Sequence, residues 1–197
     1  MKKKLLIAGD SFAADWTKKY KDVWGWVNML QSQFDVTNVA EAGVSEYKIY
    51  KQLENLNTTK FDYIIVSHTS AYRIPIIEHP IHKGDSLHNN CDIIYSDVKE
   101  YTDNPVMKTA TEFYSNIFHP EYFCFVNDLI YKEIYNLVPT ALHITFFDSF
   151  YPKNVLKFEE IFLSSKGNAN HLNKSGNEFV YKEIIKKLLN GKNKNIT

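Results

Sequence analysis

Short apolar runs alternate with amphipathic stretches along most of the chain. Each run ends at a polar or glycine-containing turn, which is typical of a buried strand. In the stretches between the runs, apolar residues return every three or four positions, as on one face of a helix. The short run 161–163 is either a further strand or the approach to the last loop. We expect strands over 5–8, 35–40, 61–66 and 141–147, and helices over 16–34, 45–56, 120–137 and 175–189.

This alternation predicts a fold class. Strands that alternate with helices pack as a parallel sheet with helices on both faces. We therefore expect an α/β protein, a three-layer α/β/α sandwich with a mostly parallel central sheet. The chain has 197 residues, of which 44% are hydrophobic, so it is long enough for one well-buried domain and short for two. We treat 1–197 as a single domain.

The first strand ends in Gly9-Asp10-Ser11. Ligands of α/β sheets bind outside the carboxyl ends of the strands, so Ser11 lies where a substrate would bind. A serine hydroxyl becomes a good nucleophile only when a base removes its proton. The polar loop that begins at Asn170 contains His171, just before the last predicted helix, and His171 is our candidate for that base.

These two segments resemble the SGNH (GDSL-like) hydrolase superfamily. In that family a Gly-Asp-Ser block near the N-terminus supplies the nucleophile, and an Asp-x-x-His-Leu-Asn-x-x-Gly block near the C-terminus supplies the base. Here 9–11 and 171–176 fill those blocks. The resemblance implies that Ser11 and His171 are catalytic and that the backbone N–H of Gly43, in the turn after the second strand, stabilises the oxyanion. It also places Trp24-Gly25-Trp26 in a helix beside the active turn.

The chain departs from the family pattern in two of its blocks. The third family block, Gly-x-Asn-Asp, follows the third strand, and here Ser67 and Thr69 replace its glycine and its asparagine. The third oxyanion donor would then be the hydroxyl of Thr69. Asn168 stands where the family has the aspartate that orients the histidine. Three outcomes remain: a Ser11–His171 dyad, a carboxylate supplied from elsewhere such as Asp148, or a degraded site that only binds.

Three further side chains near the strand ends are expected to contact substrate, namely Asp10, His68 and Arg73. His68 is also compatible with a purely structural role. Arginine is scarce in this chain, and a guanidinium binds carboxylates or phosphates in a geometry that lysine cannot match. Arg73 is therefore expected either to hold an acidic sugar or a phosphate-bearing carrier, or to form an ion pair with Glu78 or Asp62.

The segment 74–125 is the least family-like part of the chain. It contains four of the six prolines, which interrupt long helices, so we expect an insertion of loops and short helices. Such an insertion can form a lid or a contact between copies of the chain in a homo-oligomer. His79, His82 and His88 lie in it, but no cysteine or carboxylate completes a recognised ligand spacing, so no metal is expected.

Charge and composition narrow the range of partners. Lys+Arg and Asp+Glu both number 23, and this balance does not favour nucleic acid. No apolar run reaches the length of a membrane span or of a signal peptide, so we expect a cytoplasmic protein. Cys91 and Cys124 have no paired spacing and are expected to be free thiols.

The resemblance and the site residues together predict a function. We expect a serine esterase or O-acyltransferase that needs no cofactor and acts on a small ester. By family analogy, the ester is an O-acetylated carbohydrate or an intermediate of surface-polysaccharide biosynthesis. The alternative is a non-enzymatic binding or assembly protein of that pathway, which has kept the fold and lost efficient catalysis.

Overall fold

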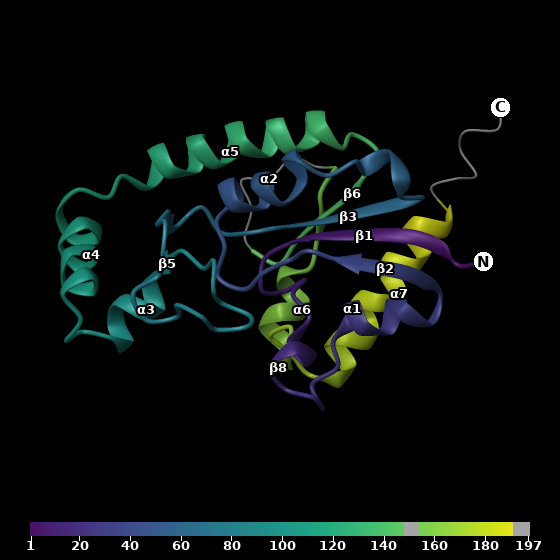
Figure 1. The fold of residues 1–197 in the computed structure, drawn as a ribbon, viewed down its shortest axis with the longest axis horizontal. Helices are drawn as coiled ribbons and strands as arrows, with labels where there is room; N and C mark the ends of the chain where they lie inside the picture. The colour runs from purple at the N-terminus through teal and green to yellow at the C-terminus, as the bar shows by residue number, and fades with distance from the viewer. Residues whose placement is uncertain (148–153, 191–197) are drawn as a thin grey trace.

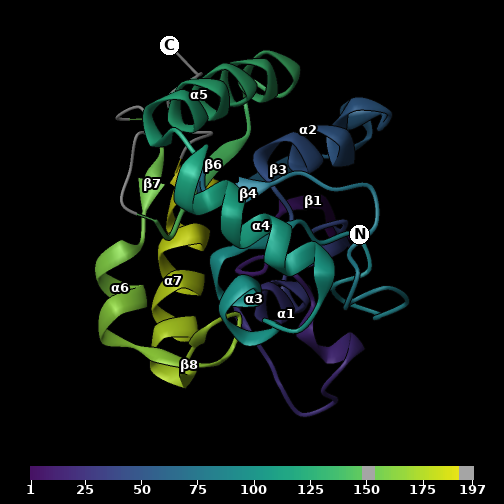
Figure 2. The same cartoon turned by 90° about the vertical axis from the view of Figure 1, so that its left-hand side faces the viewer.

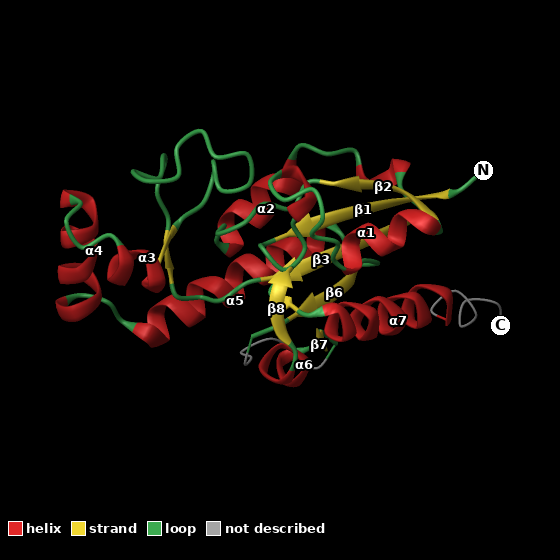
Figure 3. Ribbon diagram, turned by 90° about the horizontal axis from the view of Figure 1, so that it is seen from below, coloured by secondary structure: helices red, strands yellow, loops and turns green. Residues whose placement is uncertain are grey.

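The computed structural model describes residues 1–147 and 154–190 and has a five-stranded sheet at its centre. All described pairings in this sheet are parallel, in the order β2-β1-β3-β6-β7, as Figure 3 shows. Helices lie on both sides of the sheet, so the predicted three-layer α/β/α class is confirmed. The strands are β1 (Lys3–Gly9), β2 (Phe34–Asn38), β3 (Tyr63–His68), β6 (Leu142–Thr145) and β7 (Leu156–Lys157).

The two faces of the sheet carry separate hydrophobic cores. Leu5 and Ile7 of β1 face one core, whereas Leu6 and Ala8 face the other. Because both faces of β1 are covered, its sequence is a continuous apolar run without alternation. In Figure 1, α2 and α5 lie above the strands, and α1 and α7 lie below them. These helices are α1 (Trp26–Met29), α2 (Glu46–Glu54), α5 (Pro120–Leu137) and α7 (Lys174–Asn190).

The order of the strands positions a crevice at the carboxyl end of β1. The chain passes from β1 to β2 on one side and then returns to β3 on the other side of β1. Where the connections leave neighbouring strands in opposite directions, their loops separate and a ligand can enter. Gly9 is in register with Ser67, so the loops that follow β1 and β3 start at the same edge. Ser11 and Thr69 lie in these two loops.

Three of the four helix predictions are confirmed and one is wrong. The helix expected over 45–56 is α2. The helix expected over 120–137 is α5, with Pro120 in its first turn and the side chain of His119 accepting a hydrogen bond from the Tyr122 N–H. The final helix, α7, also forms as expected. The long helix expected over 16–34 is instead two 3-10 turns, Trp16–Lys18 and Leu30–Ser32, with the short α1 between them. Another 3-10 turn spans Thr58–Lys60.

The segment after β7 also differs from expectation. Residues 161–163 belong to a helix, α6 (Glu159–Ser164), and are not a strand. The chain then forms β8 (Lys166–Ala169), which pairs with Leu172 through isolated bridges. Among the described residues, no helix is both long enough and apolar enough to cross a membrane.

The predicted insertion forms a small layer of its own. It contains a two-stranded antiparallel sheet of β4 (Arg73–Ile74) and β5 (Ile93–Ile94), followed by α3 (Tyr95–Glu100) and α4 (Pro105–Asn116). A separate hydrophobic cluster around Met107 holds these elements together. In Figure 1 the insertion lies beyond the carboxyl ends of the main strands, and in Figure 2 its helices stand in front of them. The insertion therefore borders the crevice at the end of β1.

Candidate functional site

The turn that carries Ser11 follows β1 directly and is held from several sides. The carbonyl of Asp10 accepts hydrogen bonds from the N–H groups of Ala13 (3.0 Å) and Ala14 (2.9 Å). The indole of Trp16 donates to the Ser11 carbonyl at 2.8 Å, and the indole of Trp26 donates to the carbonyl of the next residue at 2.8 Å. Ser11 itself is 8% exposed. The hydrogen bonds that fix the turn are therefore made by its backbone carbonyls, and the Ser11 hydroxyl takes no part in them.

The C-terminal loop is bonded directly to this turn. The side-chain amide of Asn170, which is fully buried, donates to the carbonyls of Phe12 (2.9 Å) and Ala14 (2.7 Å). Asn177 binds the loop from the other side, because its amide donates to the Leu172 carbonyl at 3.1 Å. The Ser11 turn, near the N-terminus, and the His171 loop, in the C-terminal part of the chain, are therefore in direct contact.

His171 lies against the residues that follow Ser11. Its ring centroid is 4.6 Å from that of Phe12 and 5.5 Å from that of Trp16. No hydrogen bond joins the His171 ring to Ser11 in the described part of the chain, and Nε2 of the ring is buried there without a partner. Burial lowers the pKa of His171 to about 4, and the charge of Arg73 adds to the effect. The ring is therefore neutral at pH 7, the form that can accept a proton, but its low pKa makes it a weaker base than an exposed histidine.

Asp10 lies beneath the turn and not in the crevice. It is fully buried and accepts hydrogen bonds from the Phe12 N–H at 3.1 Å and the Ser67 hydroxyl at 3.3 Å. Burial raises its pKa to about 6, although Arg73 and the hydroxyls of Thr69 and Ser67 act in the opposite direction. The carboxylate is thus placed to hold the turn and to face Arg73, and it is not accessible to a ligand in this conformation.

Arg73 forms neither of the ion pairs expected from the sequence. Asp62 accepts a hydrogen bond from the Lys4 N–H at 2.9 Å, and Glu78 pairs with Lys83 at 2.9 Å. The guanidinium instead faces Asp10, with 3.6 Å between Nη2 and Oδ2. The structure therefore brings Arg73 to the carboxyl end of β1, beside the Ser11 turn.

The other predicted oxyanion donors also lie at this edge. Gly43 has φ of +77°, and a Cβ atom there would come within 2.5 Å of the Cβ of Cys91, so only glycine fits. Thr69 is fully buried, and its N–H donates to Glu46 Oε2 at 3.2 Å. Because its hydroxyl also lowers the pKa of Asp10, Thr69 contacts the base of the turn.

His68 lies in the interior, away from the crevice. Its Nδ1 lies 2.5 Å from Glu46 Oε1 and its Nε2 lies 2.9 Å from His143 Nδ1, and all three side chains are buried. Burial lowers the pKa of His143 to about 3. With both nitrogens of its ring engaged, His68 links the end of β3 to α2 and β6 and does not reach a ligand here.

The two residues proposed to orient His171 have different outcomes. Asn168 is exposed in β8 and lines a cavity of about 400 Å³ together with His171, Trp16 and Tyr20. It is therefore beside the ring but at the surface. Asp148, the alternative, lies outside the described residues.

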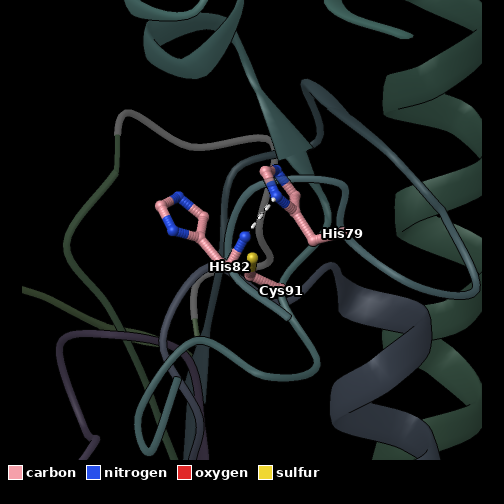
Figure 4. Close-up of side chains that lie close together, drawn as sticks. All are labelled: His79, His82 and Cys91. Atoms are coloured by element: carbon pink, nitrogen blue, oxygen red, sulfur yellow. Dashed lines mark hydrogen bonds between the residues drawn. The ribbon is translucent and has the colours of Figure 1, made fainter. Parts of the chain in front are cut away.

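Two histidines of the insertion lie close to a cysteine and an aspartate that could also bind a metal, a proximity that the spacing in the sequence did not indicate. Atoms of His79, His82 and Cys91 that could bind a metal all lie within 4.8 Å of one another (Figure 4). Asp97 Oδ2 lies 3.3 Å from His79 Nε2. However, His79 Nδ1 accepts hydrogen bonds from the N–H groups of Ile81 (3.2 Å) and His82 (3.3 Å), so its lone pair is already used. A metal-binding histidine binds the metal through one ring nitrogen and donates a hydrogen bond from the other. Because Nδ1 of His79 accepts hydrogen bonds from the backbone, His79 stabilises the turn in this arrangement.

Sequence reasoning missed the residues that assemble the site. Asn170 and Asn177 are buried and bond across the sequence, so their partners cannot be read from local pattern. Trp26, in contrast, lies beside the Ser11 turn, where the sequence analysis placed it. One signal was available for Asn170, since asparagine adopts positive φ more readily than most residues and here has φ of +51°.

Neither a known family model nor a curated protein matches this chain.

Proposed function

We propose that the protein is a serine esterase or O-acyltransferase in which Ser11 is the nucleophile and His171 the general base. The observation that carries this proposal is the pair of hydrogen bonds from Asn170 to the Ser11 turn, because it sets the adjacent His171 ring against Phe12. The neutral state of the ring at pH 7 and the residual exposure of Ser11 also support it.

In the proposed reaction, Ser11 Oγ attacks the acyl carbon while its proton passes to His171. The N–H groups of Ser11 and Gly43 stabilise the tetrahedral oxyanion, and the Thr69 hydroxyl adds a third donor once it turns away from Asp10. The bond to the leaving alcohol then breaks, and the alcohol takes the proton from His171. Water or a second alcohol attacks the acyl-enzyme, which gives hydrolysis or transfer respectively. A rotation of the Ser11 or His171 side chain is needed first, since their hydrogen bond is not formed in this conformation.

The proposed substrate is an O-acetylated carbohydrate or an intermediate of polysaccharide biosynthesis. The cavity of about 400 Å³ beside His171 supports this class, because the rings of Trp16 and Tyr20 line it and stack at 6.2 Å with an angle of 11°. Aromatic rings provide an apolar surface for the C–H face of a sugar, and the Asn168 amide can bind hydroxyls.

Hydrolysis of phenyl acetate tests the proposal. We expect Ser11→Ala and His171→Ala each to lower kcat/KM by about 100-fold or more. Lys174→Ala, at the start of α7 just after the His171 loop, is the matched control and is expected to change kcat/KM by less than about threefold, because its side chain is exposed and does not line the cavity. Equal rates for wild type and His171→Ala would refute the mechanism.

The second candidate is a binding or assembly protein that has lost catalysis. The missing Ser11–His171 hydrogen bond and the exposed position of Asn168 favour it. This candidate predicts that wild type and Ser11→Ala hydrolyse phenyl acetate at the same background rate while both bind an acetylated sugar.

A further inference from the structure

Arg73 is the only arginine in the sequence, and it is almost entirely buried at 7% exposed. Within the described part of the chain, its Nε and Nη1 atoms have no hydrogen-bond partner. Leaving a charged donor buried and unpaired is costly, and a guanidinium with a purely structural role normally has its donors satisfied. These unused donors indicate that an acceptor is missing from the site.

The position of Arg73 connects it to the Ser11 turn. The backbone at Arg73 pairs with Ile94 in the small β4–β5 sheet, which faces the carboxyl ends of the main strands. The Tyr114 hydroxyl donates to the Tyr72 carbonyl at 3.2 Å and holds the segment just before Arg73. From there, Nη2 reaches to 3.6 Å from Asp10, the residue before Ser11.

The charge of Arg73 acts on three sides of the proposed site. It adds to the burial that lowers the pKa of His171, and it opposes the burial that raises the pKa values of Asp10 and of Cys91, whose Cβ packs against Gly43. Arg73 therefore lies among the proposed nucleophile, base and oxyanion glycine.

Asp10 compensates this charge only in part. The separation of 3.6 Å exceeds the usual 2.7–3.2 Å of an N–H···O hydrogen bond. Because burial raises the pKa of Asp10 to about 6, the carboxyl group also gains a proton more readily than an exposed aspartate. Asp10 therefore engages only one side of the guanidinium, and Nε and Nη1 of Arg73 remain without a partner among the described residues.

We propose that the acyl substrate carries a negatively charged group, a carboxylate or a phosphate, that binds to Arg73 beside the Ser11 turn. This inference rests on the proposed esterase function and names the class of its substrate. A guanidinium suits either anion, since its planar set of N–H donors matches the oxygens of both groups.

Four esters of acetic acid test the inference: para-acetoxybenzoate, its uncharged methyl ester, para-acetoxyphenyl phosphate and phenyl acetate. For wild type, we expect at least one of the two anionic esters to have a kcat/KM about 10- to 100-fold above that of the methyl ester. Whichever anion is preferred distinguishes a carboxylate from a phosphate substrate. Arg73→Gln should bring the ratio close to one, and Arg73→Lys should retain part of it.

Lys83→Gln is the matched control, since it removes one positive charge from the same insertion at a site that pairs only with Glu78 among the described residues. It should leave the ratio unchanged. The wild-type comparison needs no variant, so it decides the question even if Arg73→Gln does not fold. If wild type hydrolyses neutral and anionic esters equally, the inference is overturned and the esterase stands.

Binding of para-acetoxybenzoate and para-acetoxyphenyl phosphate, measured by calorimetry, separates the two proposals. If wild type hydrolyses none of the esters but binds one of these anions, and Arg73→Gln loses that binding, the esterase is refuted and the anion site stands. If neither anion binds and none is hydrolysed faster than the methyl ester, the anion site is refuted.

Discussion

Asn170 is the residue whose removal should do most damage to the proposed site. Its side-chain amide donates two buried hydrogen bonds, to the carbonyls of Phe12 and Ala14, and its backbone has φ of +51°. In Asn170→Ala both bonds are lost, at about 1 kcal/mol each. The Ala14 carbonyl is left without this partner, which costs about 1 kcal/mol more, and alanine at positive φ adds about 1 kcal/mol.

We therefore expect Asn170→Ala to lower the free energy of unfolding by about 4 kcal/mol, a large part of the 5–15 kcal/mol typical of a domain. Asn170→Gly loses the same hydrogen bonds but tolerates the backbone angle, so it should cost about 1 kcal/mol less. Asn168→Ala, two residues earlier and exposed, should stay within about 0.5 kcal/mol of wild type.

Urea unfolding followed by circular dichroism measures these differences. At urea concentrations where Asn170→Ala is still folded, its reaction with a serine-directed reagent should also slow, because the His171 loop is no longer fixed to the Ser11 turn. If Asn170→Ala and Asn168→Ala have the same stability and the same reactivity, the link between the two ends of the chain is not what holds the site together.

Three further predictions concern the surroundings of the site. Gly43→Ala should lower the free energy of unfolding by at least about 2 kcal/mol, because its Cβ would lie 2.5 Å from that of Cys91; Gly84→Ala, with the same φ of +77° and open space around it, should cost only about 1 kcal/mol. The pKa of His143 falls from 6.5 to about 3 on folding, so stability should be lost as pH falls below 6.5, by about 2 kcal/mol at pH 5; chemical unfolding of His143→Gln should show a flatter pH dependence. The base His171 is neutral above its pKa of about 4, so kcat/KM should fall below about pH 4 and not near 6.5; a decline centred near 6.5 would contradict the burial of this ring.

The sequence predicted the parts of the fold that depend on local pattern. Continuous apolar runs located β1 and β3 because both faces of the central sheet are covered. The long helix α5 was predicted correctly because its apolar positions recur at helical spacing and Pro120 marks its start.

The failures occurred where distant segments decide the local structure. The helix expected over 16–34 is interrupted over 19–25. Gly25, the residue before α1, lies against the C-terminal loop, where a Cβ atom would come within 1.4 Å of Asn170 Oδ1. Trp24, which the resemblance placed in a helix, lies outside α1 and is 59% exposed. The three apolar residues 161–163 are too few to distinguish a helix from a strand.

The site could be predicted only in part for the same reason. Ser11 and His171 were proposed because short motifs mark them, and a hydrogen bond joins the loops that carry them. The proximity of Arg73 to Asp10, and that of Cys91 to His79 and His82, depend on how the insertion folds over the sheet. Spacing along the sequence contains no information on either contact.

The most direct test of the account is the reaction of the protein with a fluorophosphonate, followed by mass spectrometry of the labelled peptide. We predict a single label on Ser11 in wild type, no label in Ser11→Ala, and labelling slowed by about 100-fold or more in His171→Ala. Absence of label in folded wild type, or equal labelling rates for wild type and His171→Ala, would contradict the claim that the imidazole from one end of the chain activates the serine at the other.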